Sequence, residues 1–408
     1  MDIVHPHGCG LDVHKRTVVA CRLTPGVDGT PVKALRTFGT MTDDLEALAQ
    51  WLAEAGVTHV AMESTGVYWH PVWNVLEDRF TLLLVNAHHI KQVPGRKTDV
   101  KDSEWLAELL RHGLLRGSVV PDREARELRE LTRLRTSLVR DRVDVINRIQ
   151  KTLEGANIKL SAVASNVVGV SGREILAALV GGTADPALMA ELARGRLRAK
   201  IPALERALTG SFRPHHRFMI TELLAQLDFL DERVEALNQE VARRQAAVAP
   251  DIERLDAIPG VARRTAETVL SELGIDLTHF PSAGHLVSWV GICPGQHESA
   301  GKRGSGRIRK GNAALRTVLV EAAHAAGRTQ TYLGAQYRRL ARRRGVKKAA
   351  VAVAHSILVI IYHMLTRNTT YEDLGVDYFE RLDAAGRERR LVHQIEALGY
   401  TVTKPEAA

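Results

Sequence analysis

Cysteine is scarce in this chain, whose 408 residues include only Cys9, Cys21 and Cys293. Three cysteines cannot build a disulfide framework, so the sequence predicts a protein of a reducing compartment, the cytoplasm. His5 and His7 lie close to Cys9 in the sequence, but a fourth ligand is missing, which argues against a structural zinc site.

Long hydrophobic runs are also lacking. The first residues contain no basic segment that leads into an apolar core, so we expect no signal peptide. The most apolar stretch, residues 349–365, is short for a membrane span, and His355, Ser356 and His363 interrupt it. A buried core helix is the better interpretation, and no membrane partner is expected.

Acidic residues are nearly absent from one block of the chain. Between Gly301 and Lys348 there are fourteen Lys or Arg residues and a single acid, Glu321, whereas the whole chain has a net charge of +9. So one-sided a block repels itself unless a polyanion offsets it, and nucleic acid is the commonest such partner. The hydrophobic content of 45% and charged content of 25% are typical of a globular protein, and the length allows two or three domains.

Residues 1–120 have the pattern of a mixed α/β domain. The apolar periodicity predicts strands at 9–24, 31–38, 57–62 and 81–85, and helices at 43–55, 67–79 and 100–112.

Four acids fall at the ends of these elements or within them. Asp12 lies inside the first strand, Glu63 ends the strand 57–62, and Asp99 and Asp102 lie at the start of the last helix. Because sites assemble at the carboxyl ends of strands in open α/β sheets, these carboxylates are expected to meet at one edge. Hard oxygen ligands suit Mg²⁺. The alternative for Asp99 and Asp102 is an ordinary capped helix start.

Two lysines accompany the acidic pair at the start of this helix. Lys97 and Lys101 flank Asp99, so this segment would attract a polyanion such as DNA.

Residues 121–250 are predicted to be helical. A long helix over 122–153 alternates acidic and basic residues around an apolar stripe, so it packs on one side; its charged face either is solvated or contacts a nucleic-acid backbone. A second run has apolar residues at alternating spacings of four and three, which is typical of a coiled coil of about three heptads or of an intramolecular helical hairpin. Its apolar positions are Leu223, Leu227, Leu230, Val234, Leu237 and Val241.

Residues 251–408 combine helical runs with a glycine-rich, basic loop. Ile258-Pro-Gly-Val261 between two helical runs is typical of a helix-hairpin-helix, in which the Gly260 turn would present backbone N–H groups to a phosphate; a plain turn is the alternative. The glycines of 291–312 allow close backbone approach to a ligand. The basic residues expected to contact phosphates here are Lys302, Arg303, Arg307, Arg309, Lys310 and Arg316.

Taken in order, these motifs resemble those of the DEDD-type insertion-sequence transposases, the bridge-RNA-guided serine recombinases of bacterial mobile elements. GLDVHK around Asp12, MESTGVYW around Glu63 and GRKTDVKD with Asp99 and Asp102 match that family's four acidic positions. IPGV and the run SAGKRGSGRIRKGN match its C-terminal domain. The resemblance covers nearly the whole chain.

The resemblance implies an RNase H-like (RuvC-like) domain over 1–120, a helical linker with a coiled coil over 121–250, and a mainly α serine transposase domain with a helix-hairpin-helix over 251–408. It implies that the four acids hold Mg²⁺ and that Ser299 is the nucleophile of a covalent phosphoserine intermediate. Family members commonly have two serines and two glycines where this chain has Glu298-Ser299-Ala300-Gly301, so Ser299 is the candidate, apart from Ser305.

The implied partners are double-stranded donor and target DNA and a structured guide RNA encoded by the element. A homodimer or homotetramer is expected, with a site shared between protomers, because the acids and the serine lie far apart in the sequence. Two other interpretations remain open: a metal-dependent RuvC-like nuclease or Holliday junction resolvase in which Ser299 only binds a phosphate, and a nucleic-acid scaffold in which the acids are structural.

Overall fold

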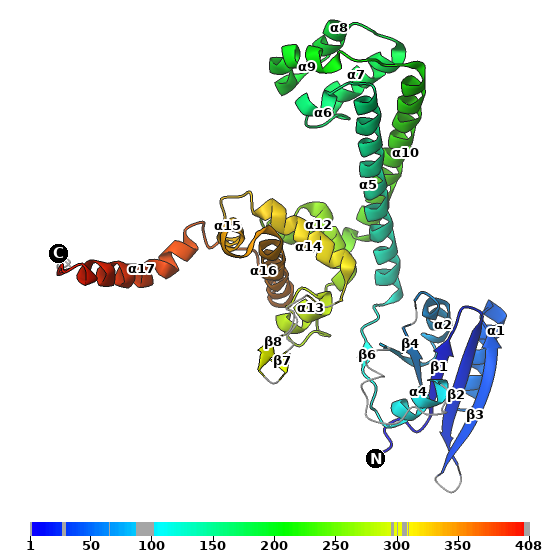
Figure 1. The fold of residues 1–408 in the computed structure, drawn as a ribbon. Coiled ribbons are helices and arrows are strands. Elements are labelled where there is room, and N and C mark those ends of the chain that lie inside the picture. Colours follow the sequence, from blue (N-terminus) through cyan, green and yellow to red (C-terminus); the bar gives the residue numbers. More distant parts are fainter. Residues whose placement is uncertain are drawn as a thin grey trace. The chain divides into compact units, whose positions relative to one another are not determined.

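The computed structural model describes residues 2–26, 30–64, 66–86, 102–294, 298–299, 301–303, 308 and 310–403 (Figure 1). Of these, residues 298–299, 302–303, 383–385 and 387 are described by their backbone only. The chain forms two compact units, Met1–Pro121 and Asp122–Ala408.

The N-terminal unit is built on a six-stranded mixed sheet with the strand order β3-β2-β1-β4-β5-β6. Strands β1, β2 and β3 are antiparallel, β1, β4 and β5 are parallel, and β6 is antiparallel to β5. The strands are β1 (Gly8–Val13), β2 (Thr17–Pro25), β3 (Pro31–Gly39), β4 (His59–Glu63), β5 (Thr81–Val85) and β6 (Gly117–Ser118). The predicted mixed α/β layout is confirmed.

One predicted strand is wrong. Residues 9–24 form two antiparallel strands, and the chain reverses between them, where the His14 N–H donates to the Thr17 carbonyl at 2.9 Å. The physical reason is the polar run His14-Lys15-Arg16, which interrupts the apolar pattern and is left exposed at the turn. The second predicted strand is therefore β3, the third of the meander.

Helices cover both faces of this sheet. Leu45, Leu48 and Leu52 of α1 (Thr42–Glu54), together with Val72 and Leu76 of α2 (Trp69–Leu76), form one core with the apolar side chains of β1 and β4. The other face is covered by α4 (Asp102–Arg111), whose Ala107 and Leu110 pack on the sheet.

A glycine allows α4 to lie directly on the central strand. A Cβ atom at Gly10 would lie 2.3 Å from the carbonyl oxygen of Ser103 and 2.4 Å from the amide nitrogen of Ala107. Any side chain at this position would push the helix off β1. The contact therefore fixes the height of α4 above the sheet.

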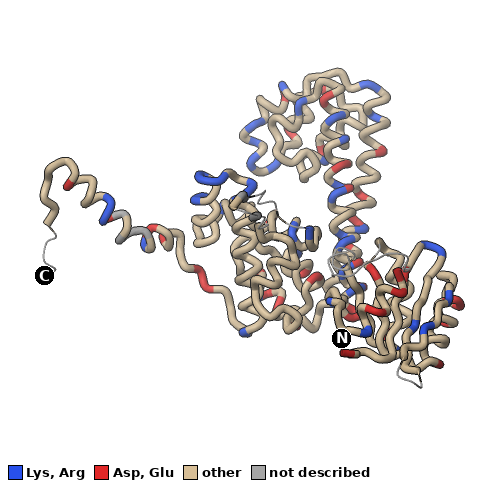
Figure 2. The backbone as a smooth tube through the Cα atoms, turned by 60° about the horizontal axis from the view of Figure 1, so that its bottom comes forward, with Lys and Arg blue, Asp and Glu red and all other residues tan. Residues whose placement is uncertain are grey.

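The second unit begins with two long antiparallel helices, α5 (Arg123–Gly155) and α10 (Pro214–Arg244). Arg142 of α5 pairs with Asp231 of α10. Seven residues earlier in α5, the Arg135 guanidinium donates to the side-chain oxygen of Asn238 at 3.3 Å, seven residues later in α10. The two helices therefore run in opposite directions. Blue and red alternate along α5 in Figure 2, which fits the predicted mixture of charges. The predicted apolar seam of α10 is used within the chain, as in a helical hairpin; a coiled coil between chains stays a prediction.

A small helical cluster joins the far ends of α5 and α10 (Figure 1). It comprises α6 (Leu160–Val163), α7 (Val170–Gly181), α8 (Pro186–Glu191) and α9 (Ile201–Leu208), with a short 3₁₀ turn at Gly195–Lys200. Their apolar side chains share one core with Val145, Ile149 and Leu153 of α5.

The C-terminal part of this unit is a helical core with a short hairpin. Its elements are α11 (Ala249–Asp256), α12 (Arg263–Leu273), α13 (Ala283–Val290), β7 (Glu298–Ser299), β8 (Lys302–Arg303), α14 (Ala313–Ala326), α15 (Tyr332–Arg344), α16 (Val346–Arg367) and α17 (Tyr378–Ala397). Helix α16 is long and apolar enough to cross a membrane by composition, but Val353, Ile357 and Ile361 lie fully buried in this core. It is a core helix, as predicted.

We expect Gly10→Ala to destabilise the N-terminal unit by about 1–3 kcal/mol, because the added methyl group overpacks the contact between β1 and α4. Gly117→Ala is the matched control: its Cβ would make only ordinary contacts with Leu83, so the change should stay within about 0.5 kcal/mol. Urea unfolding followed by tryptophan fluorescence reports on this unit, which holds four of the five tryptophans. Equal urea midpoints for the two variants would show that the contact between Gly10 and α4 does not limit side-chain size.

Candidate functional site

Two of the predicted acids lie side by side at the end of the central strands. In the parallel register of β1 and β4, Leu11 is paired with Met62, so Asp12 and Glu63 follow at the next position of the neighbouring strands. Both side chains are partly buried. The Asp12 carboxylate lies 3.2 Å from Nε2 of His14, which can orient it.

The third acid, Asp102, is brought to the same end of the sheet by the direction of α4. Ser103 contacts the strand at Gly10, while Leu110, near the other end of the helix, lies 3.2 Å from the Cβ position of Gly8. Helix α4 thus runs opposite to β1 and begins near Asp12. Asp102 is its first residue, so the helix start faces the end of β1 that carries the other two carboxylates.

The fourth predicted acid, Asp99, and the two predicted phosphate contacts Lys97 and Lys101 lie outside the described residues. Within the described part of the chain, no group of three or more His, Cys, Asp or Glu residues is close enough to hold a metal ion. The donor chemistry nevertheless fits a hard cation, because Asp12, Glu63 and Asp102 offer only carboxylate oxygens. The four-acid metal site therefore stays a prediction.

Ser299, the predicted nucleophile, lies in a short β-hairpin between α13 and α14. Its backbone pairs with Lys302, and Glu298 pairs with Arg303 across the same two strands. Gly301 has φ +76°, a conformation that favours glycine, and it belongs to the turn. An isolated antiparallel β-bridge between Pro294 and Ile308 joins the two chain segments that flank the hairpin.

The chain that follows the hairpin is fixed where it enters α14. A Cβ atom at Gly311 would lie 2.5 Å from the carbonyl oxygen of Val290, so this backbone rests on the end of α13. Asn312 caps α14, because its Oδ1 accepts from the Leu315 N–H at 3.0 Å. The Asn312 amide also donates to a carboxylate oxygen of Glu272 at 2.6 Å.

Glu272 is the centre of a buried ionic cluster between α12 and α5. Its side chain is fully buried, and Arg133 donates to both carboxylate oxygens, at 2.7 and 2.9 Å. This bidentate hydrogen bonding raises the pKa of Arg133, whereas burial lowers the pKa of Arg129, which contacts the same carboxylate at 3.6 Å. One turn earlier in α12, the buried carboxylate of Glu267 pairs with Arg135 at 2.6 Å. Through Asn312 and Arg133, Glu272 therefore connects the start of α14, which follows the hairpin, to the long helix α5.

Sequence reasoning missed this cluster. Glu267 and Glu272 look like ordinary surface charges of an amphipathic helix, and their arginine partners lie more than a hundred residues away on α5. The only local signal was Asn312, a typical helix N-cap that follows a glycine.

Of the remaining predicted phosphate contacts, Lys310 is exposed and Arg316 is partly buried in the first turn of α14, while Lys302 and Arg303 form β8. Arg307 and Arg309 lie outside the described part of the chain.

Gly260, at the predicted helix-hairpin-helix turn, has a structural role. It adopts φ +87°, and a Cβ there would lie 2.2 Å from the Ala322 carbonyl oxygen and 2.6 Å from the Ala326 nitrogen of α14. Packing of the turn on α14 thus requires glycine without any ligand. The phosphate contact at this turn stays a prediction.

Comparisons with known proteins place the chain among the transposases. A family model described as "Transposase" matches residues 9–158, and a model described as "Transposase IS116/IS110/IS902 family" matches residues 252–338. Together they match more than half of the chain, and the first contains Asp12, Glu63, Asp99 and Asp102, while the second contains Ser299.

Curated relatives agree with both models. The chain is 27% identical to the transposase for insertion sequence element IS1111A of Coxiella burnetii, over 78% of this chain and 81% of the relative. It is also 27% identical to a probable family 20 transposase of Pseudomonas aeruginosa, over 76% and 85% of the two chains. The chain belongs to the IS110 family of insertion-sequence transposases.

We expect Glu272→Gln to destabilise the C-terminal core by about 3 kcal/mol, because it leaves the largely buried Arg129 and the half-exposed Arg133 without the carboxylate that they share. Glu253→Gln, at an exposed position of α11, is the matched control and should change stability by less than about 0.5 kcal/mol. Hydrogen exchange of peptides from α12 and the first turn of α14 checks this: protection should fall there in Glu272→Gln only. Unchanged protection would show that the cluster does not hold α14.

Proposed function

We propose that this transposase is a site-specific DNA recombinase that cuts and rejoins strands through a covalent phosphoserine at Ser299, with an RNase H-like N-terminal domain and a Mg²⁺ ion held by acids. The observation that supports the proposal is the position of Asp12, Glu63 and Asp102 toward one end of the mixed sheet, in a chain that matches transposase family models over both its acids and Ser299. The strand order with three antiparallel and then parallel strands is consistent with an RNase H-like domain.

The carboxylates of Asp12, Glu63, Asp99 and Asp102 would hold the ion, which would supply Lewis-acid stabilisation of the charge that develops at phosphorus. Three of these side chains stand on rigid elements of the fold, two on neighbouring strands and one on a helix seated against Gly10. Such support is what a precise site requires, because small displacements of reacting groups cost large factors in rate.

The serine step follows from ordinary phosphoryl-transfer chemistry. The Ser299 hydroxyl loses its proton as its oxygen bonds to phosphorus, and the bond from phosphorus to one deoxyribose oxygen breaks. That oxygen leaves as a sugar hydroxyl after taking up a proton. Attack by a sugar hydroxyl of another strand reverses the step and restores both the phosphodiester and the serine, so no ATP is needed. Nearby basic residues would neutralise charge on the phosphate; they are Arg303, Arg307, Arg309 and Lys310.

The partners we propose are donor and target duplex DNA, a structured guide RNA encoded by the element, and one or three further copies of this chain. The basic block 301–348 supports a polyanionic partner. A site shared between protomers is proposed because the acids and the serine belong to different units of the chain. The bacterial relatives support a cytoplasmic protein that acts on the nucleoid.

We expect the wild-type chain, incubated with a nicked suicide DNA substrate, to give a protein–DNA band that resists denaturation. Ser299→Ala should abolish this band, because no other hydroxyl would then be available at that position. Ser305→Ala, in the same loop, is the matched control and should retain the band. A band that persists in Ser299→Ala, or that disappears only in Ser305→Ala, would overturn the assignment of the nucleophile.

A metal-dependent nuclease or junction resolvase is the second candidate. The observation that favours it is that the three described acids all belong to the N-terminal unit, so a metal site there would need no residue of the second unit. In that case the same gel would show cut DNA without a shifted protein band, and Ser299→Ala would cut as fast as the wild type.

We expect Asp12→Asn to slow strand cleavage by at least about 100-fold, because loss of even an outer partner of a metal ligand typically costs 10–100-fold. Chelation of divalent cations should stop the wild-type reaction, and added Mg²⁺ should restore it. Asp43→Asn, an exposed acid in the first turn of α1, is the control and should cut normally. Normal cleavage by Asp12→Asn would favour the scaffold interpretation, in which the acids are structural.

A further inference from the structure

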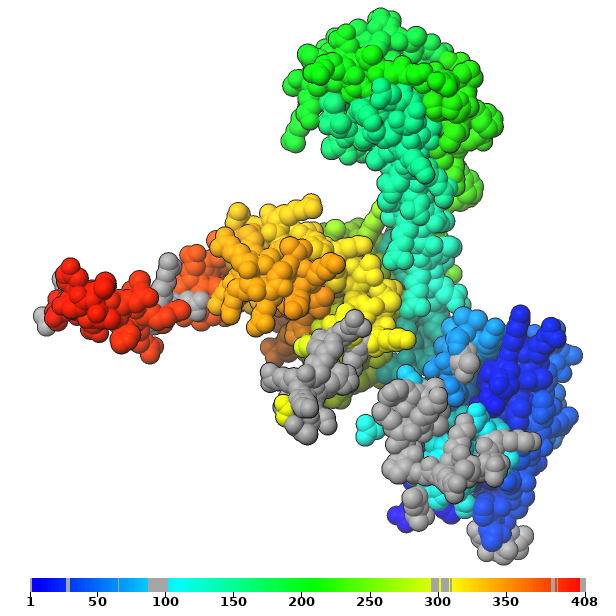
Figure 3. Space-filling model, viewed as in Figure 1, coloured from blue at the N-terminus to red at the C-terminus, as the bar shows by residue number. Residues whose placement is uncertain are grey.

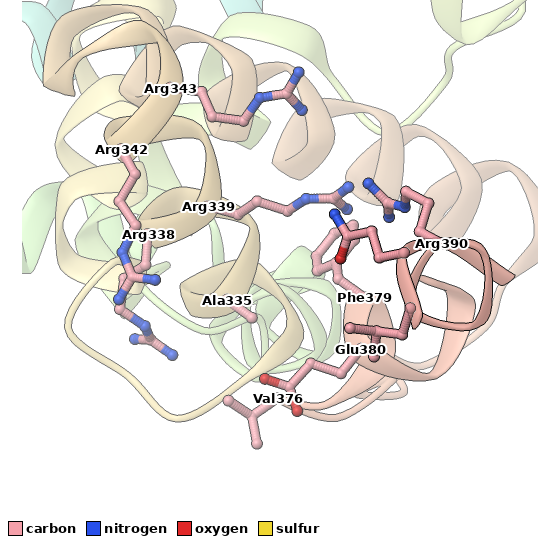
Figure 4. Close-up of a pocket in the computed structure, with 11 residues that line it drawn as sticks. Ala335, Arg338, Arg339, Arg342, Arg343, Val376, Phe379, Glu380 and Arg390 are labelled. Carbon is pink, nitrogen blue, oxygen red and sulfur yellow. The ribbon is translucent and has the colours of Figure 1, made fainter. Parts of the chain in front are cut away.

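A cavity lined by arginines lies between α15 and α17 (Figure 4), and none of the residues that line it belongs to the hairpin that carries Ser299. Its volume is about 670 Å³. Five arginines line it, and Glu380 is the single acid among the lining residues that the structure describes. The arginines are Arg338, Arg339, Arg342 and Arg343 of α15 and Arg390 of α17.

The α15 arginines form two rows along one side of the helix. Arg338 and Arg342 are four residues apart, as are Arg339 and Arg343, so each row repeats after about one turn, or roughly 5.4 Å. Arg338 is used by the fold, since it donates to the carbonyl oxygens of Gly327 and Thr329. Arg342 and Arg343 are exposed, and neither pairs with a carboxylate in the part of the chain described.

The opposite wall comes from α17. Figure 3 shows this helix, in red, beside the orange surface of α15, and Figure 4 shows Arg339 and Arg390 pointing toward one another from the two helices. The Arg339 guanidinium lies 5.0 Å from the ring centroid of Phe379, and Tyr332 stacks on the same ring at 5.3 Å. These contacts hold a cation at the cavity wall and join the helices there.

Arg342, Arg343 and Arg390 bring like charges to one cavity, whose described lining contains a single acid, Glu380. An anion bound in the cavity would reduce this repulsion. Guanidinium groups are suited to phosphate because each can donate two parallel hydrogen bonds to its oxygens. A volume of 670 Å³ is that of a small-molecule pocket, so the cavity can enclose one or two nucleotides but no double helix. Arginines with an aromatic side chain are typical of sites that track a single strand.

We propose that this cavity binds the sugar–phosphate backbone of a single-stranded nucleic-acid segment, with Arg342 and Arg343 of α15 and Arg390 of α17 as the phosphate contacts. The inference deepens the proposed function: it rests on nucleic acid as the partner, but needs neither the serine step nor the metal. The strand's source, displaced DNA or an unpaired part of the RNA, is distinguished by the experiment.

The test compares the full chain carrying Arg342→Gln and Arg343→Gln with one carrying Arg196→Gln and Arg206→Gln. The control pair is exposed on the helical cluster and changes the net charge by the same amount. Fluorescence anisotropy measures binding to single-stranded DNA, single-stranded RNA and duplex DNA. Each probe is about 20 nucleotides long, because one single-strand-binding fold typically covers fewer nucleotides than this.

The cavity variant should bind one of the single strands about tenfold more weakly at about 0.1 M salt, and the salt slope should fall by about 1.4, or about 0.7 for each lost phosphate contact. The control should match the wild type. The strand that loses more, DNA or RNA, identifies the source. Arg390→Gln, on the other wall, should weaken binding to the same strand.

Three results would overturn the proposal: unchanged single-strand binding, a loss confined to duplex DNA, or an equal loss in the control pair. Because the readout is binding, it is separable from the proposed chemistry. A cavity variant that loses single-strand affinity but still forms the Ser299 adduct supports the cavity. A cavity variant that binds single strands normally and still forms the adduct refutes the cavity alone, whereas a wild-type chain that forms no adduct refutes the serine step alone.

Discussion

Two buried glutamates set the architecture of the larger unit. Glu267 and Glu272 lie inside the contact between α12 and α5, where a carboxylate is tolerated only if cations and hydrogen bonds replace the lost water. Arg135 and Arg133 supply the cations, and each pairs with one glutamate, so α12 can sit on α5 in one register only. Helix α12 in turn is part of the core around α16. The start of the C-terminal core is therefore fixed to the long helix by charge rather than by apolar contact alone.

The same cluster reaches the loop that carries the candidate nucleophile. Asn312 connects Glu272 to the first turn of α14, and Gly311 presses the preceding backbone onto the end of α13. These two contacts anchor the backbone that follows the hairpin. The ion cluster thus links the orientation of the long helix to the place where the serine hairpin leaves the core.

In the N-terminal unit the corresponding constraint is steric. Because Gly10 has no side chain, α4 rests on the backbone of β1, and its direction brings Asp102 to the end of the sheet that carries Asp12 and Glu63. The acids are adjacent for a topological reason: β1 and β4 are parallel neighbours at the centre of the sheet. The proposed chemistry needs the acids of one unit and the serine of the other to meet at the same phosphate. The proposal therefore combines a site shared between protomers with bound nucleic acid.

The sequence by itself determined the class of the N-terminal domain, the core role of α16, the basic block and the acidic positions, because periodicity, composition and motif spacing are local properties. It misjudged the strand at 9–24, because the polar run His14-Lys15-Arg16 is too short a signal to tell a turn from exposed positions of a single strand. Only the tertiary structure decided that Gly260 packs on α14, that Glu272 is buried between arginines, and that arginines of α15 and α17 line one cavity. Each of these features depends on residues that are distant in the chain. The local sequence of a helix does not indicate whether a charged side chain is exposed to water or covered by another helix.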